Sequence, residues 1–168
     1  DSEGAGEALT MINDFYQNGY MSKELISMTQ ADMCASLFAT GKSAMMVAGS
    51  WLNTNIQNEN PDLNYGVTVL PKMDDASGQA TSILGGENMG VVAKDDTAGA
   101  VAFLKYYDQT QVMVDAMKQY GSFPPKTEAA KDAYWTDDPI QAEFITQLET
   151  SIPRGPSASW PSYSSAIQ

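Results

Sequence analysis

Histidine is absent from this chain, and cysteine occurs only once, at Cys34. The absence of histidine removes the commonest general base and a common metal ligand. A single cysteine excludes a disulfide bond within the chain, and its helix-like, apolar surroundings predict a small buried side chain and no redox role. We therefore expect no metal site, no cofactor and no catalytic residue.

Long apolar runs and basic side chains are also scarce. No run approaches the roughly 18 apolar residues needed to cross a bilayer, so we expect no membrane-spanning segment. The chain of 168 residues carries 9 Lys and Arg against 21 Asp and Glu, a net charge of −12. Such a surface disfavours nucleic acid and anionic lipid, whose phosphates attract Lys and Arg. It suits neutral or cationic ligands.

Apolar periodicity, caps and Gly stops predict helices that alternate with a few short buried strands. The predicted helices are Glu7–Asn18, Thr29–Ala39, a short one from Trp51 to Asn58, Thr97–Tyr107, Thr110–Tyr120, Thr127–Tyr134 and Pro139–Ser151. The predicted strands are Ala44–Ala48, Tyr65–Leu70 and Gly90–Ala93, and a loop is expected over 152–161. This mixture indicates an α/β fold with parallel or mixed pairing.

Two glycine-containing stretches imitate nucleotide-binding loops and fail the pattern. Gly41-Lys42-Ser43 has Ser36 where a phosphate-binding loop needs its first glycine, and it precedes a predicted strand. In the stretch 85–90, Glu87 stands where a dinucleotide loop needs its second glycine. Neither stretch therefore predicts a nucleotide site. The paired aspartates at 74/75, 95/96 and 137/138 are interpreted as solvated or helix-capping charges.

Two tryptophans lie outside any amphipathic face. Trp51 follows Gly49 in a turn, and Trp160 lies in a loop between Pro156 and Pro161. The C–H-rich face of a sugar ring stacks on such indoles, while its hydroxyls need polar partners. The residues alone leave both ligand stacking and structural packing open for each. Trp135, by contrast, is interpreted as a packing residue at a helix end.

Several stretches in order resemble one family. They are Phe38–Trp51 with its Gly-Lys-x-Ala-Met strand and Gly-x-Trp turn, Tyr65-Gly66-Val67-Thr68-Val69-Leu70-Pro71, Gly85-Gly86-Glu87 before Gly90–Lys94, Ala102–Tyr106, Gly121–Lys126, and Pro153–Trp160. This order resembles the extracellular solute-binding proteins of ABC importers, family 1, the sugar-binding, maltose-binding-protein-like type. Ser50 stands where that family more often has proline.

The resemblance implies a periplasmic-binding-protein-like fold of type II, represented by a C-terminal lobe plus a segment of the N-terminal lobe. Residues 1–64 and 127–168 would form the C-terminal lobe, 65–74 and 121–126 the inter-lobe crossings, and 75–120 a partial N-terminal lobe. The chain starts at Asp1 without Met or a signal peptide and ends in an apparent helix. We therefore expect a piece of a longer protein, the isolated piece self-associating and the parent monomeric.

The resemblance also implies a site and a mechanism. A mono- or oligosaccharide would bind between the lobes, which close by hinge motion, and the closed form would dock on ABC permease subunits. Trp51 and Trp160 would stack on sugar rings, while Gly86, Glu87 and Arg154 would complete the ligand site. The protein would be extracellular, either lipid-anchored as a lipoprotein or periplasmic.

Two alternatives stay open at this point. The first is a binder of the same family for a non-sugar ligand such as a peptide or polyamine, since the negative charge suits cations. The second is a glycosidase that uses a pair of carboxylates.

Overall fold

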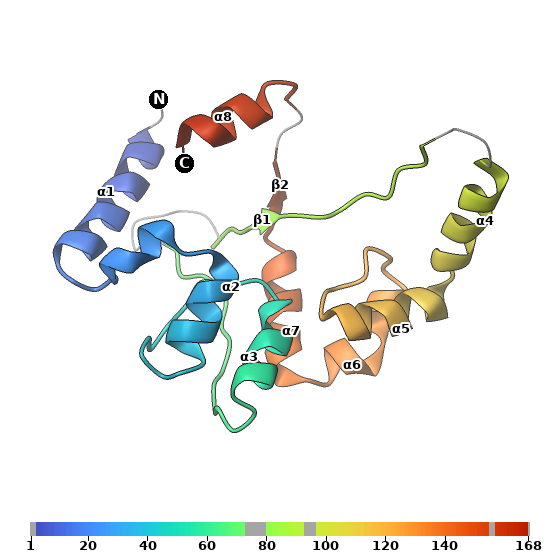
Figure 1. Ribbon diagram of the computed structural model, residues 1–168, viewed down its shortest axis with the longest axis horizontal. Helices are drawn as coiled ribbons and strands as arrows, with labels where there is room; N and C mark the ends of the chain where they lie inside the picture. The colour runs from blue at the N-terminus through green and yellow to red at the C-terminus, as the bar shows by residue number, and fades with distance from the viewer. Residues whose placement is uncertain (1–2, 73–79, 93–96, 155–156, 168) are drawn as a thin grey trace. The chain divides into compact units, whose positions relative to one another are not determined.

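The computed structural model describes residues 3–72, 80–92, 97–154 and 157–167 (Figure 1). The chain forms two compact units, Asp1–Leu63 and Asn64–Gln168. The first unit contains α1 (Glu3–Gln17), η1 (Lys23–Ser27), α2 (Gln30–Met33), the π-helical turn η2 (Cys34–Phe38) and α3 (Leu52–Glu59). The second contains β1 (Ile83–Leu84), α4 (Thr97–Tyr107), α5 (Thr110–Tyr120), η3 (Ala129–Lys131), α6 (Ala133–Thr136), α7 (Pro139–Leu148), β2 (Ile152–Pro153) and α8 (Trp160–Ile167). Within the described ranges, no helix combines the length and apolarity that a membrane span requires.

Local sequence signals set the helix ends in the first unit. Thr29 and Asp32 form a reciprocal capping box at the start of α2, as their spacing predicts. Gly19 and Gly41 both adopt a positive φ, 74° and 73°, after a helical segment. Glycine adopts this conformation without a steric penalty, so both helical segments end where the sequence indicates.

The core of the first unit lies between η2 and α3. Helix α3 packs on η2, and the buried apolar side chains are Cys34, Ala39, Leu52 and Ile56. Asn60 ties the end of α3 to this core, because its Nδ2 donates to the carbonyl of Ala39 at 2.9 Å. Burial of Cys34 as a small apolar side chain is confirmed, and this burial raises the pKa of its thiol.

The prediction of a buried strand at Ala44–Ala48 is wrong. The segment is not a strand, and Met45 and Val47 are 85% and 72% exposed. A strand needs a neighbour to complete its hydrogen-bond ladder. Among the described residues no strand lies beside this segment, and Gln30 Nε2 donates to the Val47 carbonyl at 3.2 Å.

The two other predicted strands also fail in the described residues. Tyr65–Leu70 is not a strand, and the Leu70 amide donates to the side chain of Gln147 at 2.7 Å. Residues 90–92 are not a strand either, and Ala93 lies outside the described residues. The sheet that forms instead is a parallel pair, with Ile83 opposite Ile152 and Leu84 opposite Pro153. Within the described ranges the fold is thus mostly helical with one small parallel sheet.

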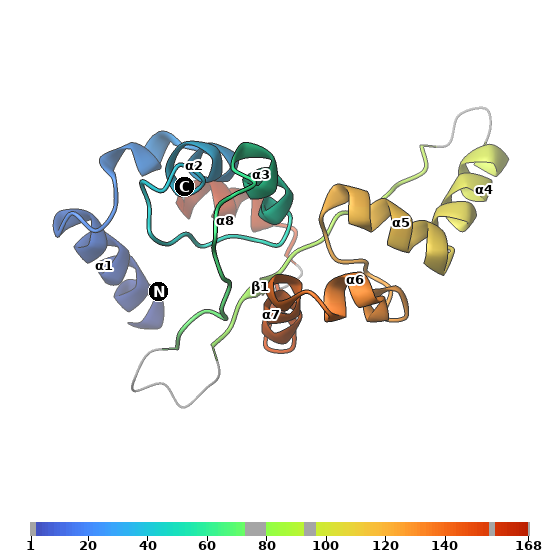
Figure 2. The same cartoon turned by 90° about the horizontal axis from the view of Figure 1, so that it is seen from below.

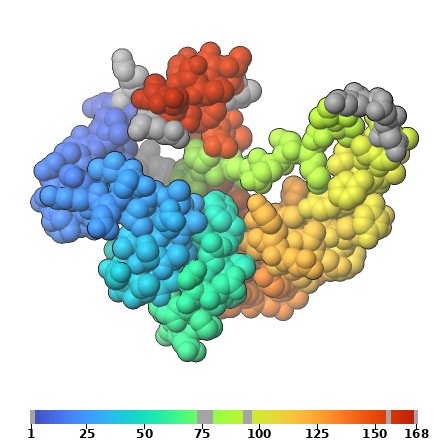
Figure 3. All heavy atoms as spheres, in the orientation of Figure 1, coloured from blue at the N-terminus to red at the C-terminus, as the bar shows by residue number. Residues whose placement is uncertain are grey.

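Trp135 organises the core of the second unit. It is 1% exposed, and it clusters with Met113 and Val114 of α5 and with Ala129 of η3. Figures 1 and 2 both show α6 beside α5, and Figure 3 shows α4, α5 and α6 as a continuous body of atoms coloured yellow to orange. The interpretation of Trp135 as a packing residue is confirmed.

The segment Gly121–Lys126 packs against this core. Gly121 ends α5 with a φ of 76°, and the ring of Phe123 lies 6.5 Å from that of Trp135. Lys126 pairs with Asp108 at 3.0 Å and so closes the loop back onto the α4–α5 junction. The segment is irregular, as its glycine and prolines predict, and it is held at both ends.

Candidate functional site

Trp51 stands at the start of α3, in a turn set by its neighbours. The amide of Leu52 donates to the Gly49 carbonyl at 3.1 Å, and the amide of Asn53 donates to the Ser50 carbonyl at 3.1 Å. Ser50 is buried, whereas Trp51 is 49% exposed. The turn therefore buries its small residue and presents its aromatic one, as the Gly-x-Trp pattern predicts.

Gly49 allows the indole of Trp51 to lie against the backbone. A Cβ added at Gly49 would sit 2.0 Å from Cζ3 and 2.2 Å from Cη2 of Trp51. No real side chain tolerates such a distance, so the indole occupies the space that any other residue would fill. Gly49 is thus a candidate for positioning Trp51. The sequence alone indicated only that Gly49 belongs to the turn.

The parallel pair β1–β2 brings Gly86, Glu87 and Arg154 to one edge. Strand β1 ends at Leu84 opposite Pro153, where β2 ends. Because parallel strands point the same way, the residues that follow each strand emerge at the same edge. Gly86 and Glu87 follow β1, and Arg154 follows β2 directly; all three are exposed. Three of the residues expected at the site thus lie just beyond the same end of the two-stranded sheet.

Trp160 is the first residue of α8, not a loop residue as predicted. Its amide donates to the Ser157 carbonyl at 3.1 Å, and the amide of Ser159 donates to the Ser157 hydroxyl at 3.2 Å. Pro161 fits the first turn of a helix because its missing amide has no partner there in any case. This is why the Pro/Ser-rich stretch starts a helix.

The guanidinium of Arg154 lies over the indole of Trp160. Its central carbon is 5.9 Å from the ring centroid, and Trp160 is 40% exposed. The distance is within the range of cation–π attraction. The second unit therefore holds Gly86, Glu87, Arg154 and Trp160, and the first unit holds Trp51.

Gln147 of α7 was missed by the sequence reasoning. Its Oε1 accepts from the Leu70 amide at 2.7 Å, while its Nε2 donates to the Ala80 carbonyl at 3.4 Å and the Thr150 hydroxyl at 2.9 Å. One amide side chain thus binds the backbone at both Leu70 and Ala80 to α7. Ala80 lies shortly before β1, which precedes Gly86 and Glu87 in the chain. A lone glutamine on a helix gives no sequence signal for such a role.

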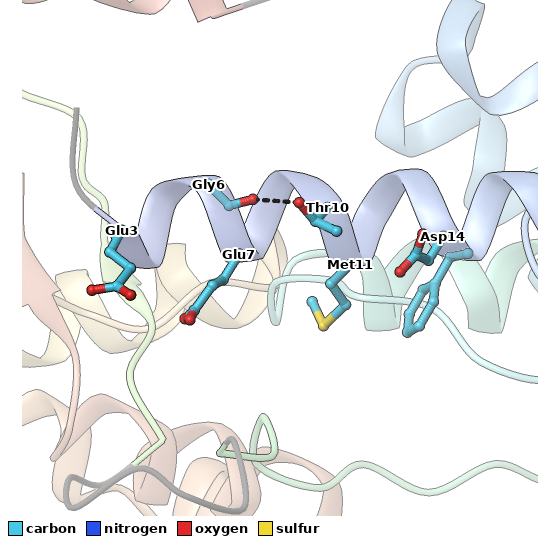
Figure 4. Close-up of a pocket in the computed structure, with 7 residues that line it drawn as sticks. Glu3, Gly6, Glu7, Thr10, Met11 and Asp14 are labelled. Carbon is cyan, nitrogen blue, oxygen red and sulfur yellow. Dashed lines mark hydrogen bonds between the residues drawn. The ribbon is translucent and has the colours of Figure 1, made fainter.

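A hollow on the surface of α1 is a poor ligand site. It is lined by Glu3, Gly6, Glu7, Thr10, Met11, Asp14 and Phe15. All of these belong to one helix, and Figure 4 shows them along its length, with the Thr10 hydroxyl donating to the Gly6 carbonyl at 2.8 Å. Ligand sites enclose most of their ligand, which a single helix cannot do.

The comparisons with known proteins decide the family. A family model described as bacterial extracellular solute-binding protein matches residues 1–143. This chain belongs to the bacterial extracellular solute-binding proteins. Membership places this solute-binding chain in an extracellular or periplasmic location.

A curated relative supports the same assignment. The galactooligosaccharide-binding protein of Bacillus subtilis (strain 168) is 31% identical to the solute-binding chain over 84 residues. The match covers 49% of this chain and 19% of that relative, so the chain spans well under two thirds of the relative's length.

Family membership points to a binding role and not to catalysis, and several of the described carboxylates have structural partners. Asp138 caps α7 by accepting from the Ile140 amide at 2.8 Å, and Asp137 accepts from the Thr136 hydroxyl. The capping interpretation of Asp138 is confirmed, whereas the pairs at 74/75 and 95/96 lie outside the described residues. The Tyr134 amide and then Lys118 lower the pKa of Asp132, which caps α6. In the part of the chain that the structure describes, no three His, Cys, Asp or Glu side chains gather as metal ligands do.

Proposed function

We propose that the chain is the distal part of the substrate-binding component of an ABC importer, and that its ligand is a mono- or oligosaccharide. The observation that carries this proposal is the presentation of two indoles, Trp51 and Trp160, each about half exposed at the start of a helix. Aromatic rings held in this way suit the apolar faces of sugar rings. The galactooligosaccharide named in the relative supports the same ligand class.

The proposed site combines stacking with hydrogen bonding. Trp51 and Trp160 stack on sugar rings, and Glu87 and Arg154 bind hydroxyls through charge-assisted hydrogen bonds. At Gly86 the backbone beside Glu87 is open to its surroundings, since a Cβ added there would meet nothing within 4 Å. The common edge at which Gly86, Glu87 and Arg154 leave β1 and β2 supports their joint role.

In the proposed mechanism, two lobes close around the bound sugar. Residues 1–64 and 127–168 belong to the C-terminal lobe, 75–120 to the N-terminal lobe, and 65–74 and 121–126 to the crossings. Sugar binding shifts the lobes towards a closed form that docks on the permease. The ring of Phe123 in the crossing 121–126 lies 6.5 Å from that of Trp135, so this crossing packs on the core of the second unit. The protein is anchored by lipid or free in the periplasm.

Replacement of either tryptophan tests the site. We expect Trp51→Ala and Trp160→Ala each to weaken saccharide binding by about 1–3 kcal/mol, the range of stacked aromatic anchors. Tyr120→Ala is the matched control, because Tyr120 is an exposed aromatic residue outside the proposed site. Isothermal titration of the complete protein measures the affinities. Equal affinity in all variants would remove both indoles from the site.

The ligand class is tested separately by a thermal-shift screen. A ligand that binds only the folded state raises the melting temperature by mass action. We expect neutral oligosaccharides to raise it and polyamines and short peptides to leave it unchanged. A shift with polyamines or peptides alone would replace the sugar proposal with the non-sugar alternative. Sustained hydrolysis of a glycoside would contradict a purely binding role.

A further inference from the structure

We propose that Arg154 is a positioning residue for Trp160. Its guanidinium lies over one face of the indole and leaves the opposite face as the one on which a ligand ring stacks. The ligand part of this inference rests on the proposed function, whereas the pairing of the two side chains does not.

The first argument is electrostatic. The guanidinium carbon lies 5.9 Å from the centroid of the Trp160 ring, where the negative π-face attracts a cation. Arg154 is the only arginine of the chain. Within the described residues the ion pairs are Lys118–Asp132, Lys126–Asp108 and Lys131–Glu128, so no carboxylate there forms an ion pair with Arg154. In the part of the chain that the structure describes, the indole is thus the partner towards which this charge is oriented.

The second argument is that both residues stand on fixed backbone. Arg154 follows β2, whose Ile152 amide donates to the Ser82 carbonyl at 2.9 Å. Trp160 is held by the turn at Ser157, where two amides find acceptors. Side chains placed by element ends keep their geometry better than side chains within a free loop.

The third argument concerns what the pair presents to a ligand. A guanidinium keeps its N–H donors at its rim in one plane, so a position over a ring leaves donors at that rim for other acceptors. The pair therefore presents an apolar indole face beside several donors. A pyranose carries the matching surface, a C–H-rich face bordered by hydroxyl oxygens.

Acrylamide quenching of tryptophan fluorescence tests the pairing without any ligand. A Trp51→Phe background leaves Trp160 as the accessible indole, because Trp135 is 1% exposed. We expect Arg154→Ala to raise the quenching constant, by up to roughly twofold if one of two ring faces is uncovered. Arg154→Lys should give an intermediate value, since lysine keeps the charge but lacks the flat guanidinium.

Lys105→Ala is the matched control, since it removes one exposed positive charge from α4 without touching Trp160. The control should leave the quenching constant unchanged. An unchanged constant in Arg154→Ala, or an equal rise in Lys105→Ala, would overturn the positioning role.

Saccharide titration of the Arg154 and Lys105 variants with Trp51 retained then separates this inference from the proposed function. We expect Arg154→Ala to weaken binding roughly two- to fivefold, as loss of an exposed cation–π contact allows. Weaker binding with unchanged quenching would mean that Arg154 acts only by contacting the ligand, and the positioning role would fall. If no variant binds any saccharide, the proposed function fails, while the quenching result still decides whether Arg154 positions Trp160.

Discussion

Gly49 and Trp51 show how one missing Cβ shapes the candidate site. The six-membered part of the indole lies where a side chain at position 49 would begin. The turn brings the two residues together through the amide of Leu52, which donates to the Gly49 carbonyl. The exposure of Trp51 is therefore set by its own turn and does not require a partner from elsewhere in the chain.

Gly49→Ala tests this dependence. The added methyl must displace the indole, so we expect greater acrylamide quenching of Trp51 in a Trp160→Phe background. We also expect a loss of about 1–3 kcal/mol in the free energy of unfolding, as for other overpacked sites. Gly66→Ala is the control, because nothing lies within 4 Å of a Cβ added there. Similar behaviour of the two variants would refute the close approach.

At the scale of single elements, side-chain caps fix where several helices begin. Thr29 and Asp32 cap α2, Asp132 caps α6, and Asp138 caps α7. The carboxylate of Asp138 accepts from the Ile140 amide, and Pro139 occupies the first helical position. Such caps act over two or three residues, which is why the sequence predicted the starts of α2 and α7. The start of α6 was not predicted, because the sequence indicated one helix over Thr127–Tyr134, where the structure has η3 and then α6.

Asp138→Ala should therefore destabilise the protein. We expect a loss of about 1 kcal/mol in the free energy of unfolding, typical of a removed N-cap. Asp138→Asn should retain most of the stability, because asparagine caps helices nearly as well as aspartate. Chemical denaturation followed by circular dichroism measures both. Equal losses in the two variants would show that the charge matters more than the hydrogen bond.

The strands show the opposite behaviour at the same scale. Ala44–Ala48 is a short apolar run and Tyr65–Leu70 is rich in β-branched residues, but neither has a strand beside it in the described residues. Ile83 and Ile152 pair although they are far apart in the sequence. The composition of a segment indicates whether it favours an extended backbone. Whether it becomes a strand depends on which other segment lies beside it and pairs with it.

At the scale of the whole molecule, exposed apolar side chains are abundant. Met45, Val92 and Phe103 are among the large apolar residues that remain exposed. The net charge of −12 opposes contact between copies. Salt screens this repulsion and leaves the hydrophobic attraction in place.

We therefore expect the chain to self-associate as the salt concentration rises. Sedimentation velocity should show larger species at high salt than at low salt. A Met45→Ser, Val92→Ser double variant should associate less, because both side chains are more than four-fifths exposed, at 85% and 84%. Gln57→Ser, an exposed polar substitution, is the control. A chain that stays monomeric at all salt concentrations would contradict this prediction.

The sequence by itself determined the family, the capped starts of α2 and α7, the glycine stops after α1, η2 and α5, the buried roles of Cys34 and Trp135, and the turn that presents Trp51. Each of these depends on residues a few positions apart in the sequence or on the order of motifs along it. The tertiary structure alone decided the pairing of β1 with β2, the anchoring by Gln147 and the position of Arg154 over Trp160. These depend on contacts that only the folded backbone creates, because local preference does not specify which distant segment will lie alongside.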